Sequence, residues 1–85
     1  MDHFVYILLS EKDGSFYIGS SKDPFQRLLK HNAPHKGYTA KKQPWKIVYT
    51  EKLEDKRSAL KREKFLKSQK SHEFLLNLIS GSPAG

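Results

Sequence analysis

An arginine and a histidine lie four residues apart in the stretch FYIGSSKDPFQRLLKHN, residues 16–32. At this spacing Arg27 and His31 would share one face of a helix. Arginine is suited to two-pronged phosphate recognition, and histidine exchanges protons near neutral pH. Each residue taken alone is more simply explained by a solvated helix surface, so the pair indicates phosphate chemistry only together with further groups.

Two tyrosines lie in strand-like segments on either side of a turn. Tyr6 and Tyr17 fall on the same face of a hairpin if its loop holds an even number of residues. Core packing is the simplest role for either ring. A catalytic phenolate would need a neighbouring arginine, lysine or metal ion, because free tyrosine ionises near pH ~10.

A single acidic residue, Glu63, interrupts the otherwise basic stretch 56–70. On a helix it would lie on the core-facing stripe that is marked by Ala59, Leu60 and Leu66. An inward carboxylate is costly unless it meets a cation. That cation would be either a neighbouring lysine or arginine, or a Mg²⁺ ion that is shared with water and a substrate phosphate.

Positive charge is concentrated in two blocks of this chain, whose formal net charge is +7. Residues 22–46 contain seven Lys or Arg and one acid, and residues 56–70 again contain seven and one, so each block carries +6. Such clustering favours a nucleic-acid partner over a merely solubilising lysine-rich surface, because phosphate contacts release counterions. The candidate contacts are Lys22, Lys30, Lys36, Lys41, Lys42, Arg57 and Lys61.

The chain has 85 residues and no cysteine, which predicts one domain and excludes disulfides and thiolate metal sites. Its longest early apolar run, residues 4–9, is too short for the core of a signal peptide or for a membrane span. We therefore expect a soluble cytoplasmic protein without a membrane partner.

Local patterns predict three strands and three helices in the order β-β-α-β-α-α. This order fits a small α/β or α+β domain over residues 1–80, followed by a disordered tail at 81–85. The first strand is apolar on both faces, so we expect it at the centre of the sheet. The predicted strands are residues 3–9, 16–19 and 45–50, and the predicted helices begin at Asp23, at Glu54 or Asp55, and at Ser71.

The first helix carries apolar residues at i, i+3 and i+4, so Phe25, Leu28 and Leu29 are expected to face the core. The arginine and histidine of this helix would then border the core from a neighbouring face. Just before the helix, Gly19 would either end the second strand or let another backbone come close.

Two short motifs make the chain resemble the GIY-YIG nuclease family, specifically its small stand-alone bacterial members. Phe4-Val5-Tyr6 and Tyr17-Ile18-Gly19 are separated by ten residues, like the two motifs of the family name. The stretches GSSKDPFQRLLKHN and PWKIVYTEKLEDKRSALKREKFLK are similar to the family's arginine helix and to its third strand and glutamate helix, so the likeness covers residues 3–79. Phe4 replaces the first glycine of the family motif, which alters backbone freedom but no reacting group.

The resemblance implies a three-stranded antiparallel sheet flanked by helices, and hydrolysis of DNA phosphodiester bonds with one Mg²⁺ or Mn²⁺ ion. It also implies a role for each residue already singled out. Tyr6 and Tyr17 would orient the phosphate and help to activate water, and Arg27 would neutralise charge on the phosphate. His31 would assist proton transfer, and Glu63 would bind the metal.

The resemblance constrains substrate and partners less tightly. Branched or damaged DNA, as met in DNA repair, is the expected substrate class, and specificity would come from a partner protein, from DNA structure, or would be low. The alternative is a nucleic-acid-binding module that cleaves weakly or not at all, and a purely structural interaction domain fits the basic blocks less well. Asn77 is the candidate for an asparagine that many members carry after the glutamate.

Overall fold

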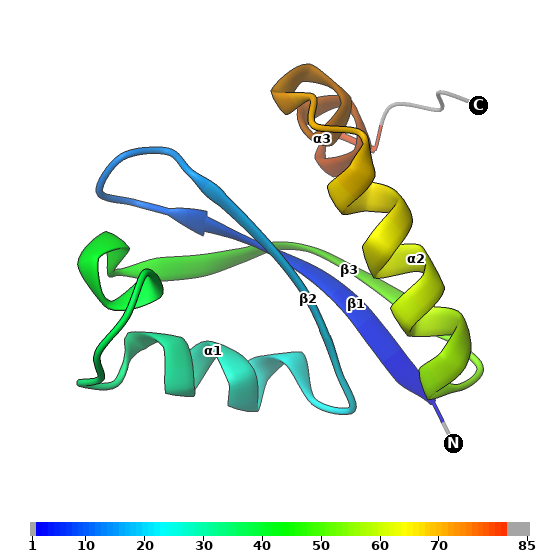
Figure 1. The fold of residues 1–85 in the computed structure, drawn as a ribbon, viewed down its shortest axis with the longest axis horizontal. Helices are drawn as coiled ribbons and strands as arrows, with labels where there is room; N and C mark the ends of the chain where they lie inside the picture. The colour runs from blue at the N-terminus through cyan, green and yellow to red at the C-terminus, as the bar shows by residue number, and fades with distance from the viewer. Residues whose placement is uncertain (1, 82–85) are drawn as a thin grey trace.

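The computed structural model describes residues 2–81 and contains the predicted strands and helices in the predicted order, with one additional short 3₁₀ helix (Figure 1). The predicted tail lies outside the described residues apart from Gly81, which follows the last helix with a φ of +71°. Within residues 2–81, no helix is long and apolar enough to cross a bilayer. The elements are β1 (His3–Ser10), β2 (Phe16–Ser21), α1 (Pro24–Asn32), η1 (Thr39–Lys42), β3 (Trp45–Leu53), α2 (Lys56–Ser68) and α3 (His72–Ile79).

β1 is the central strand, as predicted from its two apolar faces, and it pairs antiparallel with β2 on one side and β3 on the other. Val5 and Ile7 face one side of the sheet and Tyr6 and Leu8 face the other, and all four are buried. The β1–β2 hairpin turns at Gly14, whose φ of +78° is readily available to glycine. The fold is therefore a small α+β domain.

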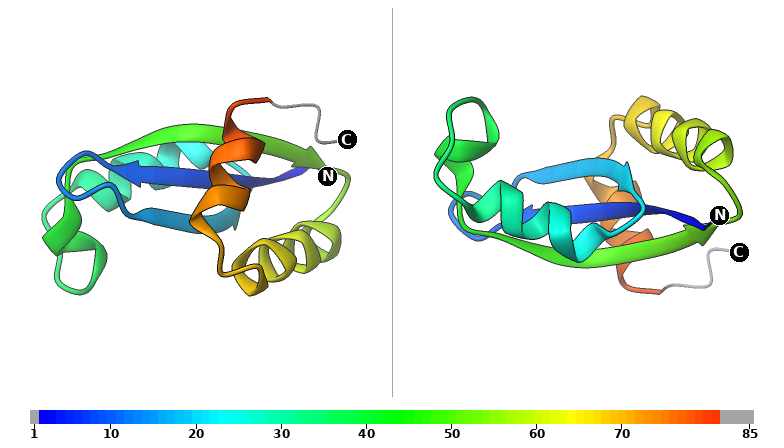
Figure 2. Two further views of the ribbon diagram at one scale, coloured as in Figure 1. Left: turned by 90° about the horizontal axis from the view of Figure 1, so that it is seen from above. Right: turned by 90° about the horizontal axis from the view of Figure 1, so that it is seen from below.

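The helices cover both faces of this sheet (Figure 1). α1 lies on the face of Tyr6 and Leu8, where Leu28 packs against the same cluster as Trp45. α2 and α3 lie on the opposite face. In the view from above, α3 lies in front of the strands, and in the view from below α1 lies in front of them (Figure 2). The cluster between the sheet and α2 and α3 consists of Val5, Ile7, Ile18, Ala59, Leu66 and Leu75.

The predicted helix starts are confirmed. Each of the three α-helices is preceded by a side chain that accepts a hydrogen bond from the amide three residues later, which satisfies one of the free N–H groups of the first turn. The caps are Asp23, Asp55 and Ser71, at donor–acceptor distances of 3.2, 2.8 and 3.1 Å.

The predicted inward face of α1 is correct for Leu28, which packs against the core cluster, and wrong for Phe25 and Leu29. Phe25 and Leu29 are 67% and 63% exposed, although their spacing suggested a core contact. Instead the helix turns Leu28 and His31, three residues apart, toward the sheet. The physical reason is that the sheet beneath α1 offers the Tyr17 ring, against which the imidazole of His31 packs.

The predicted inward face of α2 is correct in two of its three apolar positions. Ala59 and Leu66 are buried, but Leu60 is 48% exposed. Leu60 lies where α2 passes the edge strand β2, so it lines an open hollow instead of the core. On α3, Leu75 belongs to the core cluster, and three further apolar residues pack against it: Phe74, Leu78 and Ile79.

The basic segment between α1 and β3 is anchored at both ends. The side chain of Asn32 donates to the Trp45 carbonyl at 2.9 Å and accepts from the Trp45 amide at 2.7 Å. The side-chain amide of Gln43 donates to the carbonyls of His31 and Ala33 at 2.7 and 2.8 Å. These bonds hold the start of β3 against the end of α1.

Candidate active site

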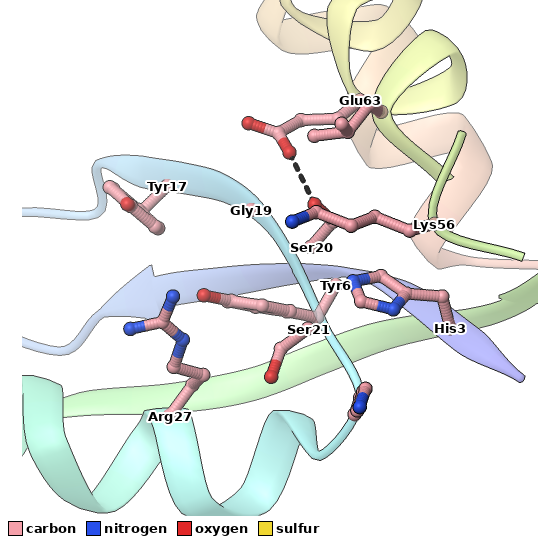
Figure 3. A pocket seen from close by; sticks show the side chains of 11 residues that line it. His3, Tyr6, Tyr17, Gly19, Ser20, Ser21, Arg27, Lys56 and Glu63 are labelled. Carbon is pink, nitrogen blue, oxygen red and sulfur yellow. Dashed lines mark hydrogen bonds between the residues drawn. The ribbon is translucent and has the colours of Figure 1, made fainter. Parts of the chain in front are cut away.

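An open hollow of about 470 Å³ lies at the edge of the sheet, where β2 passes between α1 and α2 (Figure 3). Residues from β1, β2, α1 and α2 meet there, as far apart in the sequence as positions 3 and 63. Four of the five residues predicted to do chemistry line it: Tyr6, Tyr17, Arg27 and Glu63. The fifth, His31, packs against the ring of Tyr17 and does not itself line the hollow.

The two tyrosines lie on the same face of the hairpin, as predicted for an even loop. Leu9 pairs with Phe16, which leaves six residues in the loop between them. Tyr6 pairs with Gly19, two positions beyond Tyr17, so the rings are diagonal neighbours with centroids 6.4 Å apart. Both phenols therefore belong to the same hollow.

Gly19 makes room for the Tyr6 ring. A Cβ atom at this position would lie 2.5 Å from the Tyr6 hydroxyl oxygen and 3.1 Å from Cε1 of Tyr17. β2 continues through Gly19 to Ser21, so the predicted end of the strand was placed too early. The group that comes close to Gly19 is the side chain of Tyr6, and not a second backbone as the sequence allowed. The missing side chain lets the Tyr6 phenol lie across the strand.

Tyr6 stays protonated at neutral pH. Burial raises the pKa of Tyr6 to about 12, and the nearby Tyr17 adds to this rise. The positive charge of Arg27 lowers the Tyr6 pKa, but it does not outweigh burial, and the carboxylate of Glu63 raises it again. In the resting protein Tyr6 is therefore a hydrogen-bond donor and not a phenolate.

Arg27 reaches the hollow from α1, whereas His31, one turn later, does not line it. The His31 ring packs against Tyr17 with centroids 4.6 Å apart, and its centroid lies 6.5 Å from that of Trp45. Burial lowers the pKa of His31, and the charges of His35 and Arg27 lower it further. His31 is therefore a neutral imidazole at pH 7 that supports the Tyr17 ring from behind.

Glu63 enters the hollow from α2, over the edge of β2. Its Oε1 accepts a hydrogen bond from the Ser20 hydroxyl at 2.7 Å (Figure 3), and its Oε2 pairs with Lys67 Nζ at 2.7 Å. The side chain of Glu63 is 18% exposed. Of the two cations that the sequence allowed, the structure shows the lysine, and the carboxylate also faces the hollow of the two tyrosines.

The hollow also contains residues that the sequence did not single out. Ser20 follows Gly19 in β2 and, because strand side chains alternate, it points toward α2. Lys56 precedes Glu63 by about two helical turns, a spacing that could have revealed it. His3, which is 8% exposed, lines the hollow from the start of β1, and only strand pairing brings it there.

The predicted nucleic-acid contacts are placed on several surfaces. Lys22 lines the hollow, and Arg57 and Lys61 lie on the outer side of α2. Lys42 is instead ion-paired with Asp13 of the hairpin, so its charge is largely neutralised within the fold. The remaining candidates are exposed on α1 and the following segment: Lys30, Lys36 and Lys41.

The side chains of the hollow that could bind a metal ion can be compared with the ligands that different metal ions prefer. Within residues 2–81, His, Cys, Asp and Glu side chains do not gather in groups of three, and the carboxylate in the hollow is that of Glu63. Asn77 is exposed on α3 and does not line the hollow. Mg²⁺ takes one or two protein carboxylates and completes its shell with water and phosphate. The residues present therefore fit Mg²⁺ or Mn²⁺ and do not fit a structural zinc ion.

Comparisons with known proteins point to one family. Residues 2–77 match the GIY-YIG catalytic domain. A UPF0213 protein of Staphylococcus saprophyticus is 42% identical over 79 residues, which cover 92% of this chain and 94% of that protein. A UPF0213 protein of Staphylococcus aureus is 45% identical over 67 residues, which cover 78% of this chain and 80% of that protein. The solution NMR structure of a UPF0213 protein from Bacillus halodurans has a TM-score of 0.58 at 31% identity, and the match covers 99% of this chain and 88% of that one.

Proposed function

Because this chain belongs to the GIY-YIG family, we propose that it is a metal-dependent endonuclease that hydrolyses a phosphodiester bond of DNA in the hollow beside β2. One observation carries the proposal, namely the meeting of Tyr6, Tyr17, Arg27 and Glu63 in one open hollow. Packing alone does not require an arginine and a glutamate to share a hollow with two phenols. Phosphodiester hydrolysis does require positive charge at the phosphate, an oriented water and a stabilised leaving oxygen.

In this proposal Arg27 and Glu63 offset the negative charge of the phosphate, one directly and the other through a metal ion. Arg27 donates paired N–H groups to phosphate oxygens and offsets their negative charge. Glu63 would hold Mg²⁺ or Mn²⁺, and such an ion would supply positive charge that stabilises the phosphate and the leaving oxygen. The hydrogen bond from Ser20 keeps Oε1 of Glu63 oriented. The Lys67 ammonium must leave Oε2 before a metal ion can bind that oxygen.

In this proposal Tyr6, Tyr17 and His31 orient the attacking water and accept its proton. Protonated Tyr6 donates a hydrogen bond to a phosphate oxygen or to the attacking water. Tyr17 orients that water, and the neutral imidazole of His31, which packs against the Tyr17 ring outside the hollow, takes the released proton through the Tyr17 phenol. A positioned base of this kind contributes about 10²–10⁴ in rate.

A DNA-binding module with little or no cleavage is a second candidate, and the ion pair of Lys67 favours it. The Lys67 ammonium already occupies the Glu63 carboxylate as an internal cation. In a binding module that pair stays intact, and the basic residues still hold DNA with an affinity that falls steeply with salt. Branched or damaged DNA is the proposed ligand class in both cases, with a partner protein as one route to targeting.

A cleavage assay separates the two candidates. Flap, nicked, branched and plain duplex DNA are incubated with the protein in the presence of Mg²⁺ or of a chelator. We expect cleavage only with metal, and a loss of about 10²–10³-fold in Glu63→Gln and in Arg27→Ala, with DNA binding of Glu63→Gln near that of the wild type. Glu73→Gln makes the same change at an exposed position of α3 and is the matched control. Binding without cleavage of any substrate would support the binding module, and full activity of Glu63→Gln would remove the metal role.

A further inference from the structure

A second hollow, of about 500 Å³, lies along the outer side of α2. Two of its residues, Lys56 and Leu60, also line the candidate active site, so the two hollows adjoin at these side chains. Its lining comes from one helix and comprises Lys56, Arg57, Leu60, Lys61 and Lys64. We call these five residues the α2 strip.

The cations of the α2 strip have no acidic partner within residues 2–81. The ion pairs of this part of the chain are Lys42–Asp13, Lys52–Asp2, Arg62–Glu51 and Lys67–Glu63. The two cations of α2 outside the strip, Arg62 and Lys67, are thus neutralised, whereas those of the strip are not. Unpaired like charges on one helix face repel one another, and a polyanion would relieve that repulsion.

The length of the strip suits a run of phosphates. Helix residues rise by about 1.5 Å each, so Lys56 and Lys64 are separated by about 12 Å along the axis of α2. One strand of duplex DNA carries a phosphate every ~3.4 Å of axis, so about four phosphates fit along this length. The strip is therefore better matched to a nucleic-acid strand than to a single small anion.

Leu60 lies on the border between the two hollows and is 48% exposed. A strand that passes from the active site to the cations of the strip must lie against this side chain. Apolar side chains at DNA contacts pack against bases and sugars, which phosphate-binding cations do not. The position of Leu60 thus suits contact with a nucleotide next to the reacting one.

We infer that one DNA strand leaves the candidate active site past Leu60 and runs along the α2 strip, which supplies most of the electrostatic binding. This inference rests on the proposed function, since it takes DNA as the ligand. The basic segment between α1 and β3 contributes less, because it lies at the opposite end of the sheet from α2 (Figure 1). None of the described residues 33–44 lines either hollow.

Binding measured across a salt series tests the electrostatic part. Fluorescence anisotropy on labelled flap and duplex DNA is recorded with chelator present, so that no cleavage occurs. Lys61→Ala/Lys64→Ala is compared with Lys46→Ala/Lys70→Ala, which removes the same charge from exposed positions outside the strip and outside the predicted nucleic-acid contacts. We expect the strip variant to lose about tenfold in affinity at low salt and to flatten the log–log salt slope by about 1–2, and the control to stay within about twofold.

A second pair of variants tests the apolar contact. Leu60→Ala is compared with Leu76→Ala on α3, because the two side chains are 48% and 49% exposed and cost similarly little in folding. We expect Leu60→Ala to weaken DNA binding by about threefold or more while Leu76→Ala leaves it unchanged. Thermal unfolding of every variant verifies that the fold is retained.

The outcomes distinguish this inference from the proposed function. Equal losses in the strip and control variants, or an unchanged salt slope in the strip variant, would overturn the inference and leave the endonuclease proposal intact. A wild-type protein that binds DNA through the strip but cleaves none would overturn the endonuclease proposal and keep the strand path. A wild-type protein without salt-dependent DNA binding would overturn both.

Discussion

Gly19→Ala is expected to disturb the candidate active site through one neighbouring side chain. The added Cβ would lie 2.5 Å from the hydroxyl oxygen and 2.7 Å from Cζ of Tyr6, about 0.9 and 0.7 Å short of the 3.4 Å at which ordinary contacts begin. The Tyr6 ring is 2% exposed, so it has little free space into which it can retreat. Either the phenol moves out of the hollow or β2 bends away from β1.

The cost of this overlap should resemble that of overpacking a core. Inserting a methyl group into a well-packed site typically costs about 1–3 kcal/mol, and we expect a loss in this range in the free energy of unfolding. DNA cleavage, if the proposed function is correct, should fall more steeply than stability, because a displacement of about 1 Å at a reacting group can cost about 10² in rate.

Urea denaturation followed by the fluorescence of Trp45, the single tryptophan, measures the stability. Tyr6→Phe removes the atom nearest to the new methyl group, so Gly19→Ala should cost about 0.5–1 kcal/mol less in the Tyr6→Phe background. Gly14→Ala is the control, because a Cβ there meets nothing within 4 Å and its cost should not depend on residue 6. A Gly19→Ala protein as stable as the wild type, with no coupling to Tyr6, would refute the placement of the phenol.

Three further substitutions test the site and its support. Lys67→Ala should raise the affinity for Mn²⁺ in a calorimetric titration, because the ammonium no longer competes for Glu63. His31→Gln should flatten the pH dependence of stability. Burial holds the pKa of His31 below its usual 6.5, so the unfolded chain binds the proton first, and the wild type loses stability as the pH falls through and below that value. Asn32→Ala should lower the free energy of unfolding in urea by about 1–2 kcal/mol, because both hydrogen bonds to the Trp45 backbone are lost.

Each of these predictions has a contrary outcome. Lys64→Ala makes the same charge change without touching Glu63, and equal Mn²⁺ affinity of the two lysine variants would show that the ion pair does not compete. A His31→Gln protein with the pH dependence of the wild type would place the linked proton on another group. An Asn32→Ala protein of unchanged stability would leave Gln43 as the sufficient anchor of the segment.

The sequence by itself determined the order of the elements and where the helices begin, because these features depend on neighbours along the chain. Asp23, Asp55 and Ser71 cap their helices through the amide three residues later, which is a local interaction. The sequence placed Tyr6 and Tyr17 on one face only on condition of an even hairpin loop, and the strand pairing supplied that condition. The motifs around these tyrosines, taken together with the spacing of Arg27, His31 and Glu63, also supported the family resemblance, which the comparison over residues 2–77 confirms.

Only the tertiary structure decided what each helix face meets. Periodicity shows which residues share a side but not what covers it, and so Phe25 and Leu29 are exposed while His31 packs on the sheet. Ser20 and Glu63 are 43 positions apart, and their hydrogen bond exists because α2 passes the edge of β2. The hollow is created by this long-range packing, about which the local preferences of single segments carry no information.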